Sequence, residues 1–385
     1  MKKIYFISIQ DLIYVPPVIA IIELLSELGF KIILCGVYSD NSNKEKLINK
    51  GVLFKDFSYS GEKGNLLKRI FSKFSFRKKI IKFLKKETLS SNDLIWITRA
   101  ESLIFFRKLT KNYKVIYHSL EFRGTKLNWR ASIESPFTSL TKVVRNCYKV
   151  ICCEYNRAQI TKGIYNLSYL PYVLPNKSII KIPDVNSIPS NVLDIINKIK
   201  ILVGNRKIIL YQGGFNAKER RLDEYCDAIL TLKDKFVLIL LGSTKDKGYY
   251  SFLKKKYKDE NIIFIPFITP PYHLLITKLA YIGILTYFPD SKSFADVINP
   301  IYCAPNKIFE YSKFNLPMIG NNIPGLYYPF IEYNCGRVIN YPLNVSEIIN
   351  TIKEIDNNYD ILSKGSQEFY KSVNMKQILH KIVEN

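Results

Sequence analysis

The chain has 385 residues, which is too long for one ordinary core and suits two domains of about 150 to 200 residues each. The 47% hydrophobic and 23% charged fractions are typical of a globular protein and exclude wholesale disorder. A net charge of +24 favours an anionic partner, such as a phosphate-bearing substrate, nucleic acid or anionic lipid. The plainer alternative is that a chain rich in Lys, Asn, Ile and Tyr is basic for no functional reason.

The cysteine and histidine content narrows the chemistry. The seven cysteines are odd in number and show no Cys-x-x-Cys spacing, which argues against a disulfide scaffold or structural zinc site and fits a reducing cytosol. Only three histidines are present, so a His-rich metal centre is excluded. The uncharged run 261–277 contains three prolines and is shorter than the roughly 20 residues of a membrane span. We expect a soluble or peripheral protein without a signal peptide.

Short apolar, β-branched segments alternate with helix-length segments along the whole chain. The expected strands are 3–9, 31–38, 52–57, 93–98, 114–118 and 149–153, followed by 207–212, 236–241, 261–266, 281–287, 316–320 and 336–340. Their continuous hydrophobicity is typical of parallel strands that helices cover on both faces. The pattern predicts two six-stranded α/β domains.

The domain boundary is expected where proline, asparagine and serine accumulate, in a linker over residues 177–205. Residues 1–176 would form the first domain and residues 206–365 the second. Open parallel sheets bind ligands at the carboxyl ends of their strands, so two such domains facing each other would enclose a cleft there.

The first informative segment of the second domain is ILYQGGFNAKERRLDEYCDAI, residues 209–229. The expected strand ends at Gln212, and Gly213 and Gly214 then leave room for a ligand close to the backbone. Arg220 and Arg221 precede a helix, so a diphosphate placed here would meet guanidinium groups and a helix N-terminus. An ordinary tight turn is the alternative interpretation of the two glycines.

The second informative segment is CAPNKIFEYSKFNLPMIGN, residues 303–321. It predicts a helix that begins with Asn306 as its cap and ends at a left-handed Asn315. Glu310 in this helix is suited to accept two hydrogen bonds from a ribose diol, and Lys307 would face the same side. The alternative is a surface Lys307–Glu310 pair, worth about a few tenths of a kcal/mol.

Together these two segments resemble the donor-binding half of retaining, family 4-type glycosyltransferases with the GT-B fold. The resemblance covers about 150 residues of the second domain and the first domain only by topology. It implies two Rossmann-like domains facing a cleft, with a last helix, about 366–385, that crosses back to the first domain. It also implies a nucleotide-sugar donor, in the first place a UDP-sugar, and neither a cofactor nor a metal.

The resemblance also implies roles for single residues. Arg220 or Arg221 would hold the pyrophosphate and Glu310 the ribose, and the segment 261–268, which ends beside Phe267, is similar to the one whose backbone recognises the nucleobase. Tyr302 departs from the family, which has a glutamate there, and Asn306 and Lys307 would take over its contacts to the donor sugar. The resemblance therefore says less about the donor sugar and the mechanism of this chain than about its nucleotide site.

In the first domain, the segment KVIYHSLEFRG places His118 and Glu121 at the carboxyl end of a strand. Either side chain is a candidate base, with Asp11 as a further candidate, and a purely structural role is the alternative for His118. Three nearby residues are candidates for binding the acceptor: Arg123, Trp129 and Arg130.

A basic segment, residues 64–86, contains nine basic residues and no acidic one. Leu67, Ile70, Phe74, Ile81 and Leu84 recur at helical spacing, which is typical of an interfacial helix on anionic lipid. Lys78 and Lys79 belong to this basic segment. A core-facing stripe with solvated lysines is the alternative, and both interpretations are compatible.

We expect a metal-independent hexosyltransferase, retaining in its stereochemistry, that moves a sugar from a nucleotide donor to a polyprenyl-phosphate-linked or other glycan acceptor. Capsule, O-antigen or other surface-polysaccharide synthesis at the inner face of the cytoplasmic membrane would be its setting. A nucleotide-sugar 2-epimerase on the same fold is one alternative. A basic nucleic-acid-binding protein is another, although no nucleic-acid-binding module is recognisable.

Overall fold

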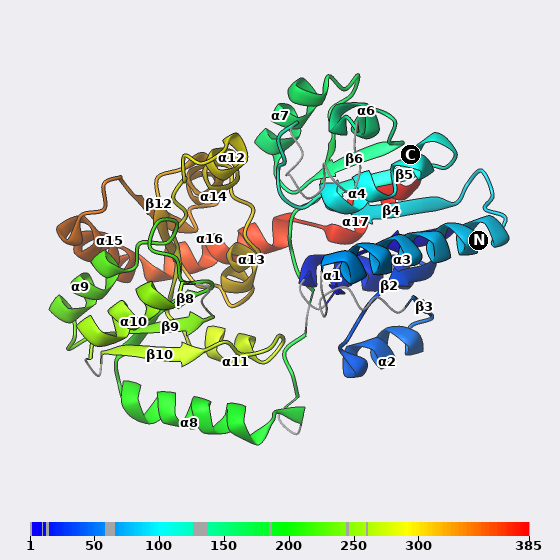
Figure 1. Cartoon of the computed structure of the whole chain (residues 1–385). Helices are drawn as coiled ribbons and strands as arrows, with labels where there is room; N and C mark the ends of the chain where they lie inside the picture. Colours follow the sequence, from blue (N-terminus) through cyan, green and yellow to red (C-terminus); the bar gives the residue numbers. More distant parts are fainter. Residues whose placement is uncertain are drawn as a thin grey trace. The chain divides into compact units, whose positions relative to one another are not determined.

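The computed structural model describes residues 2–9, 11–12, 15–57, 66–125, 138–179, 181–184, 187–243, 246–258 and 261–384. The chain forms two compact units. Unit 1 comprises Met1–Pro175 and Asn374–Asn385, and unit 2 comprises Asn176–Val373. Each unit has a parallel sheet with helices packed on it (Figure 1). Within the described ranges, no helix combines the length and the apolar character needed to cross a membrane.

Unit 1 contains a seven-stranded sheet in the order β3-β2-β1-β4-β5-β6-β7. Its strands are β1 (Lys3–Ile7), β2 (Lys31–Gly36), β3 (Leu53–Asp56), β4 (Leu94–Thr98), β5 (Val115–Ser119), β6 (Lys149–Cys152) and β7 (Tyr172–Val173). Its helices are α1 (Pro16–Glu27), α2 (Asn41–Asn49), α3 (Leu66–Lys86), α4 (Ala100–Phe105), the 3-10 helix η2 (Arg107–Lys111), α6 (Leu140–Arg145), α7 (Tyr155–Tyr165) and α17 (Met375–Glu384). Strands β4, β5 and β6 are buried along their whole length, as expected for parallel strands covered on both faces.

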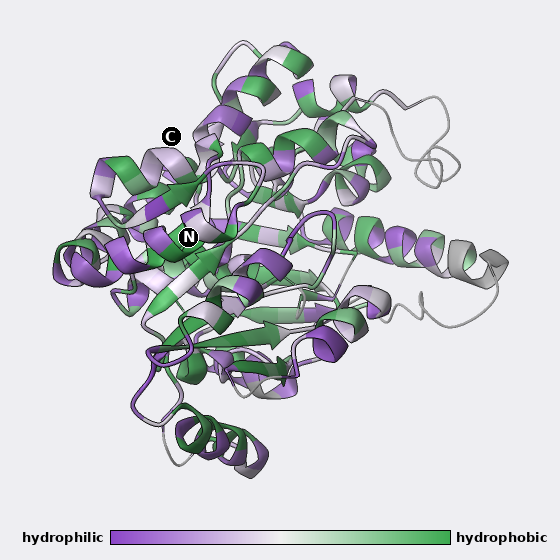
Figure 2. Cartoon of the chain, turned by 90° about the vertical axis from the view of Figure 1, so that its left-hand side faces the viewer, coloured by the Kyte–Doolittle hydropathy of each residue, from purple (hydrophilic) through white to green (hydrophobic). Residues whose placement is uncertain are grey.

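Unit 2 contains a six-stranded sheet in the order β10-β9-β8-β11-β12-β13. Its strands are β8 (Lys207–Gln212), β9 (Phe236–Gly242), β10 (Ile262–Pro266), β11 (Ile282–Leu285), β12 (Met318–Asn321) and β13 (Gly336–Ile339). Its helices are α8 (Ser190–Val203), α9 (Asp223–Thr231), α10 (Lys247–Lys256), α11 (His273–Thr277), α12 (Phe294–Ile301), α13 (Asn306–Lys313), α14 (Pro324–Tyr333), α15 (Val345–Asn357) and α16 (Tyr359–Ser372). Figure 2 shows the strands as largely hydrophobic ribbons, which is the pattern that predicted them.

The predicted fold class is confirmed: two parallel sheets with interleaved helices form two Rossmann-like units. The sequence does not predict β7, because this strand has only two residues and both are partly exposed. The last helix, α17, is part of unit 1, where the Lys149 ammonium donates to the Ile382 carbonyl at 2.6 Å. Within the expected linker, α8 packs Val192, Ile196 and Ile199 into the core of unit 2.

One close contact fixes α13 against the sheet of unit 2. A Cβ on Gly283 of β11 would lie 2.4 Å from the Tyr311 ring of α13, so only glycine fits beneath this ring. The Tyr311 hydroxyl lies 3.1 Å from the Leu210 carbonyl and 3.3 Å from the Ile284 carbonyl, and the Gln212 amide donates to it at 3.2 Å. Tyr311, near the end of α13, thereby fixes this helix against the carboxyl halves of β8 and β11.

Candidate functional site

The glycine turn after β8 packs tightly against the end of β9. The Gly213 amide donates to the Leu241 carbonyl at 2.9 Å, and a Cβ on Gly242 would lie only 1.8 Å from the Gly213 oxygen. Gly213 has a φ of 154°, and a Cβ there would lie 2.9 Å from Lys307 Cε. The missing side chain at Gly213 therefore makes room for the amine of Lys307.

Helix α13 places Lys307 and Glu310 on the same side, as predicted from their spacing. Its cap is Pro305 in an extended conformation without a side-chain cap hydrogen bond, and Asn306 is the first helical residue. The prediction that Asn306 caps the helix is therefore wrong, because its side chain starts one position inside the first turn. The prediction for Asn315 is confirmed, since its φ is 57°.

The Glu310 carboxylate is held by groups from two other elements. The Gln212 side-chain amide, at the end of β8, donates to Glu310 Oε2, and His273 Nε2 in α11 lies 3.5 Å from Oε1. Burial acts to raise the pKa of Glu310, but His273, the Lys307 charge and the Gln212 hydrogen bond together hold that pKa below its ordinary value. Glu310 is thus an ionised carboxylate whose partners are Gln212 and His273, not one half of a surface ion pair.

Lys307 lies in a desolvated, positively charged environment. Burial and the nearby Arg220 lower the pKa of Lys307 to about 8, against the attraction of Glu310. The Lys307 ammonium lies 5.9 Å from the centre of the Tyr287 ring. A negatively charged ligand here would restore the charge of this amine.

Arg220 approaches the same aromatic ring from the loop that follows the glycine turn. Its guanidinium carbon lies 4.6 Å from the centre of the Tyr287 ring. The loop is tied to the end of β11, where the Thr286 hydroxyl donates to the Arg220 carbonyl at 2.8 Å. Tyr287 is itself fixed by Asn321, which accepts from the Tyr287 amide at 2.8 Å and donates to its carbonyl at 2.7 Å.

Arg221 points to different partners. Its guanidinium donates to the Tyr341 hydroxyl at 3.1 Å and lies 3.5 Å from the Glu224 carboxylate. Its backbone is left-handed, with a φ of 45°, which turns successive side chains of the loop apart. Of the two candidate arginines, the structure places Arg220 beside Lys307.

Two cations, a glycine turn and an ionised carboxylate therefore converge at the carboxyl end of the sheet in unit 2. This arrangement suits a ligand that combines a diphosphate with a diol. The sequence missed Tyr287, Gln212 and His273 as members of the site. Gln212 and Tyr287 stand at the ends of predicted strands, which is the signal that could have found them.

Phe267 follows β10 at this same edge of the sheet, and its side chain is 59% exposed. Exposure of a large aromatic ring at the carboxyl end of a parallel strand is compatible with the predicted contact to a ligand. No contact in the described part of the chain assigns it that role, so its part in nucleobase recognition stays a prediction.

In unit 1, the ring of His118 is buried, with 1% of its surface exposed. It packs against Trp96, its Nε2 lies 3.9 Å from Cys153 Sγ, and burial lowers the pKa of His118 to about 3. The imidazole is therefore neutral at physiological pH. A role as base stays a prediction that would require this ring to become exposed.

The other residues predicted in unit 1 lie closer to the surface. Glu121 is exposed and forms an ion pair with Arg123 at 3.2 Å, and Arg123 also lies 3.5 Å from Glu101. The Asp11 carboxylate accepts a hydrogen bond from the Ser39 amide at 3.2 Å. Trp129 and Arg130 lie outside the described residues, so their predicted acceptor contacts stay predictions.

No protein-family model matches this sequence, and neither does any curated protein. Solved structures match it over its full length. HepE of Anabaena, in complex with UDP, gives a TM-score of 0.68 at 12% identity, covering 100% of this chain and 99% of HepE. The chain has the GT-B fold. A glycosyltransferase from Rickettsia africae also gives a TM-score of 0.68, at 14% identity, and the match covers 100% of this chain and 97% of the Rickettsia chain.

WaaG, a glycosyltransferase involved in lipopolysaccharide biosynthesis, matches with a TM-score of 0.62 at 11% identity, covering 99% of this chain and 98% of WaaG. The predicted GT-B fold is thereby confirmed. Among the described residues of this GT-B chain, no group of three or more His, Cys, Asp or Glu side chains could hold a metal ion.

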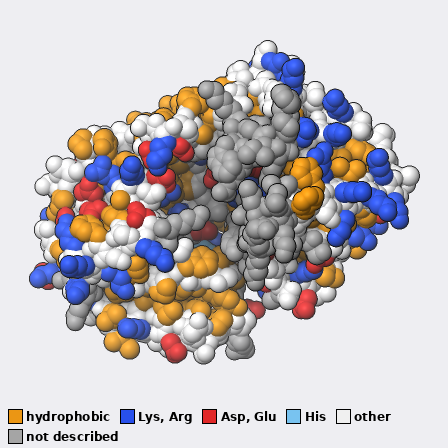
Figure 3. Space-filling model, viewed as in Figure 1, with side chains coloured by type: hydrophobic (Ala, Val, Ile, Leu, Met, Phe, Trp, Pro, Cys, Tyr) orange, Lys and Arg blue, Asp and Glu red, His pale blue; other side chains and the backbone are white. Residues whose placement is uncertain are grey.

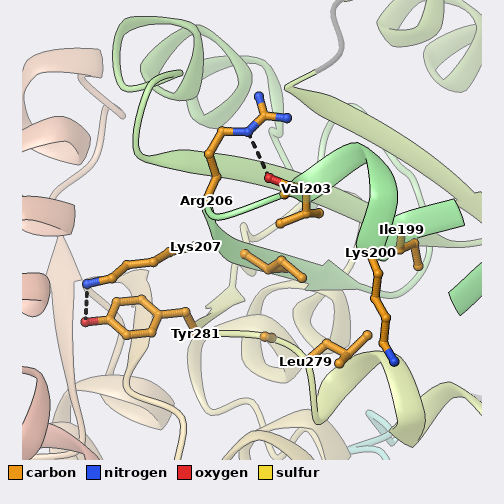
Figure 4. Close-up of a pocket in the computed structure, with 10 residues that line it drawn as sticks. Ile199, Lys200, Val203, Arg206, Lys207, Leu279 and Tyr281 are labelled. Atoms are coloured by element: carbon orange, nitrogen blue, oxygen red, sulfur yellow. Dashed lines mark hydrogen bonds between the residues drawn. The ribbon is translucent and has the colours of Figure 1, made fainter. Parts of the chain in front are cut away.

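A cavity of about 330 Å³ lies elsewhere in unit 2, at the amino end of β8 (Figure 4). Its lining includes Lys200, Arg206, Lys207 and Tyr281. Arg206 donates to the Val203 carbonyl, and Lys207 donates to the Tyr281 hydroxyl and forms an ion pair with Asp356. Two of the three lining cations are thus engaged within the protein, and open α/β sheets usually bind ligands at the opposite, carboxyl edge.

Proposed function

We propose that this protein is a glycosyltransferase that takes its sugar from a nucleotide donor, in the first place a UDP-sugar. The observation that carries the proposal is the convergence of Arg220 and Lys307 beside Gly213, with the ionised Glu310 one helical turn away. HepE, which shares the fold, is described in complexes with UDP and with UDP-glucose. Because the sequence identity is low, the shared fold does not establish the activity, which is inferred from the residues of the site.

In the proposed reaction, the two cations act on the leaving group. Arg220 and Lys307 would neutralise the negative charge that grows on the diphosphate as the bond to the sugar breaks. Glu310 would accept hydrogen bonds from the ribose hydroxyls and orient the donor. We further propose retention at the sugar carbon, on the strength of the resemblance to family 4-type enzymes, with no nucleophile supplied by the chain. The acceptor hydroxyl would form the new bond to the sugar carbon on the face that the diphosphate leaves, and its proton would pass to the departing phosphate oxygen.

For the acceptor we propose a polyprenyl-phosphate-linked glycan of surface-polysaccharide synthesis, reached at the inner face of the cytoplasmic membrane. The support comes from α3, which buries Phe76, Ile80 and Leu84 in the core of unit 1. The opposite side of α3 exposes five lysines: Lys78, Lys79, Lys82, Lys85 and Lys86. Figure 3 shows Lys and Arg side chains gathered over the part of unit 1 that carries α3.

Two exposed aromatic rings accompany these lysines. The Phe71 side chain is 72% exposed and that of Phe74 is 42% exposed. The core-facing stripe thus differs from the predicted one, which included Phe74. Lysines beside unburied aromatic rings suit an anionic lipid surface, at about 1 kcal/mol for each basic residue near it.

The donor site is tested by thermal shifts of the purified protein with UDP, GDP, TDP, CMP and ADP, each without added metal. We expect a stabilisation of several degrees with one diphosphate, absent in Glu310→Ala. Absence of any shift in the wild type would contradict the proposal.

Incubation of the sugar nucleotide without acceptor then separates a transferase from a 2-epimerase, since an epimerase changes the sugar without an acceptor. Salt-titrated binding to single and double strands tests the nucleic-acid alternative.

A further inference from the structure

Three elements of unit 2 meet at the carboxylate of Glu310. Gln212 comes from the end of β8, His273 and Thr277 come from α11, and Glu310 projects from α13. The Glu310 side chain is 17% exposed and that of His273 is 13% exposed, so this cluster is largely desolvated. Hydrogen bonds in such surroundings are directional and strong.

The orientation of the Gln212 amide follows from its two neighbours. A carboxylate can only accept, so the amide must present its nitrogen to Glu310 and its oxygen to the other side. On that other side, the Thr277 hydroxyl donates to Gln212 Oε1 at 2.9 Å. Thr277 is fully buried, so this hydroxyl keeps the amide from turning over.

His273 holds the second carboxylate oxygen. Its Nε2 lies 3.5 Å from Glu310 Oε1, and its Nδ1 is buried without a hydrogen-bond partner in the described part of the chain. The polar contact that the structure gives this ring is therefore the one to Glu310. With Gln212 on Oε2 and His273 on Oε1, rotation of the carboxylate about its last bond is blocked from both sides.

We propose that His273 and Gln212 are positioning residues, which fix the Glu310 carboxylate in the one orientation that selects nucleotides with an intact ribose diol. This inference rests on the proposed function. It adds two residues that do not touch the reacting atoms, and one of them, His273, lies outside both sequence motifs. The competing explanation is that His273 only packs α11 against α13. The two explanations differ in whether ribose selectivity depends on its polar nitrogen.

The experiment measures binding by calorimetry, with no turnover needed. The probes are UDP, GDP, ADP and CDP, each beside its 2′-deoxy counterpart, and the variants are Glu310→Ala, His273→Leu and His273→Gln. We expect the wild type to prefer the ribonucleotide by about tenfold or more, as one hydrogen bond to a charged group supports. Glu310→Ala and His273→Leu should both lose this preference, whereas His273→Gln, which retains an N–H donor, should keep most of it.

Two further variants sharpen the comparison. His380→Leu makes the same change at an exposed histidine of α17 and should leave the preference untouched. Thr277→Val keeps the shape of a buried side chain but removes the hydroxyl that orients Gln212, so the preference should fall with little loss of diphosphate affinity.

The outcomes separate the inference from the proposed function. If the wild type binds none of the nucleotides, the proposed function fails and this inference fails with it. If Glu310→Ala keeps the ribose preference, Glu310 does not contact the ribose. The inference and the role proposed for Glu310 are then overturned, while a nucleotide-binding site without that role stands. If Glu310→Ala loses the preference but His273→Leu keeps it, the donor site stands and the positioning role alone is overturned. If His273→Leu and His273→Gln lose the ribose preference equally and also lose thermal stability equally, His273 acts through packing, and the positioning role is overturned.

Discussion

Lys307 occupies the space that a side chain on Gly213 would require. A Cβ on Gly213 would lie 2.9 Å from Lys307 Cε and 3.0 Å from its ammonium nitrogen. Tyr311, one turn further along α13, anchors the helix to the carbonyls of β8 and β11. The amine is therefore held over the glycine turn by a buried tyrosine, and the turn and the helix form one packed unit.

This relationship makes the two glycines unequal. Gly213→Ala should displace the Lys307 amine and strain a backbone with a φ of 154°, whereas a Cβ on Gly214 would meet its nearest neighbour, the Ser243 carbonyl, at 3.8 Å. We expect Gly213→Ala to weaken diphosphate binding by about tenfold or more and to cost about 1–3 kcal/mol of stability. Calorimetry and denaturant unfolding measure both quantities. Equal effects of Gly213→Ala and Gly214→Ala would contradict the assignment of this space to Lys307.

The two arginines after the glycine turn should differ as well. Arg220 lies beside Tyr287 and Lys307, while Arg221 is engaged with Tyr341 and Glu224. We expect Arg220→Met to weaken binding of a nucleoside diphosphate by about tenfold to a hundredfold, since a charged hydrogen bond is lost. Binding of the matching nucleoside should change little. Arg221→Met serves as the control. Its affinity for the nucleoside diphosphate should stay within about threefold of the wild type, because Arg221 contacts Tyr341 and Glu224 near the surface. A larger loss in Arg221→Met than in Arg220→Met would assign the diphosphate to Arg221.

Proton uptake should accompany diphosphate binding near pH 8. The pKa of Lys307 is lowered to about 8 by burial and by Arg220, so its amine is only partly charged there. A bound diphosphate favours the charged form, so binding takes up protons, and affinity falls as the pH rises above 8. The second ionisation of a phosphate lies near about 6 and is complete before this range.

Calorimetry in two buffers of different ionisation enthalpy measures this uptake. We expect about half a proton per ligand at pH 8 in the wild type, since a group at its pKa is half charged. Lys307→Met should show none and a flatter affinity profile above pH 8. Lys218→Met, which removes an exposed charge from the loop that carries Arg220, should behave as the wild type. Unchanged uptake in Lys307→Met would assign the proton to another group.

The lysines on the exposed side of α3 should be required for binding to anionic lipid vesicles. Charge reversal in Lys78→Glu with Lys79→Glu should weaken sedimentation with vesicles that contain phosphatidylglycerol by about tenfold or more, at about 1 kcal/mol per charge removed. Reversal of Lys254 and Lys255, which are also exposed and lie on α10 of unit 2, is the matched control. Added salt should weaken the wild-type interaction. Equal loss in both double variants would show a general charge effect and not a surface on α3.

Continuous apolar runs were sufficient to predict the fold. Strands such as Leu94–Thr98 and Ile282–Leu285 are buried on both faces, which is typical of parallel sheets with helical crossovers. The two short motifs likewise predicted Arg220, Lys307 and Glu310, because strand ends and helix periodicity are local properties of the chain. His118 was less accessible to such reasoning, since its position at a strand end does not reveal the Trp96 ring that covers it.

The sequence alone thus determined the two Rossmann-like units and predicted which cations and which carboxylate belong to the candidate site of unit 2. The tertiary structure decided which of them meet. It separated Arg220 from Arg221 through a left-handed backbone at Arg221, and it brought Gln212 and His273 to Glu310 from elements far apart in the chain. The physical reason is that hydrophobic patterning specifies which face of an element is buried, whereas a contact between two side chains depends on how those elements pack against each other.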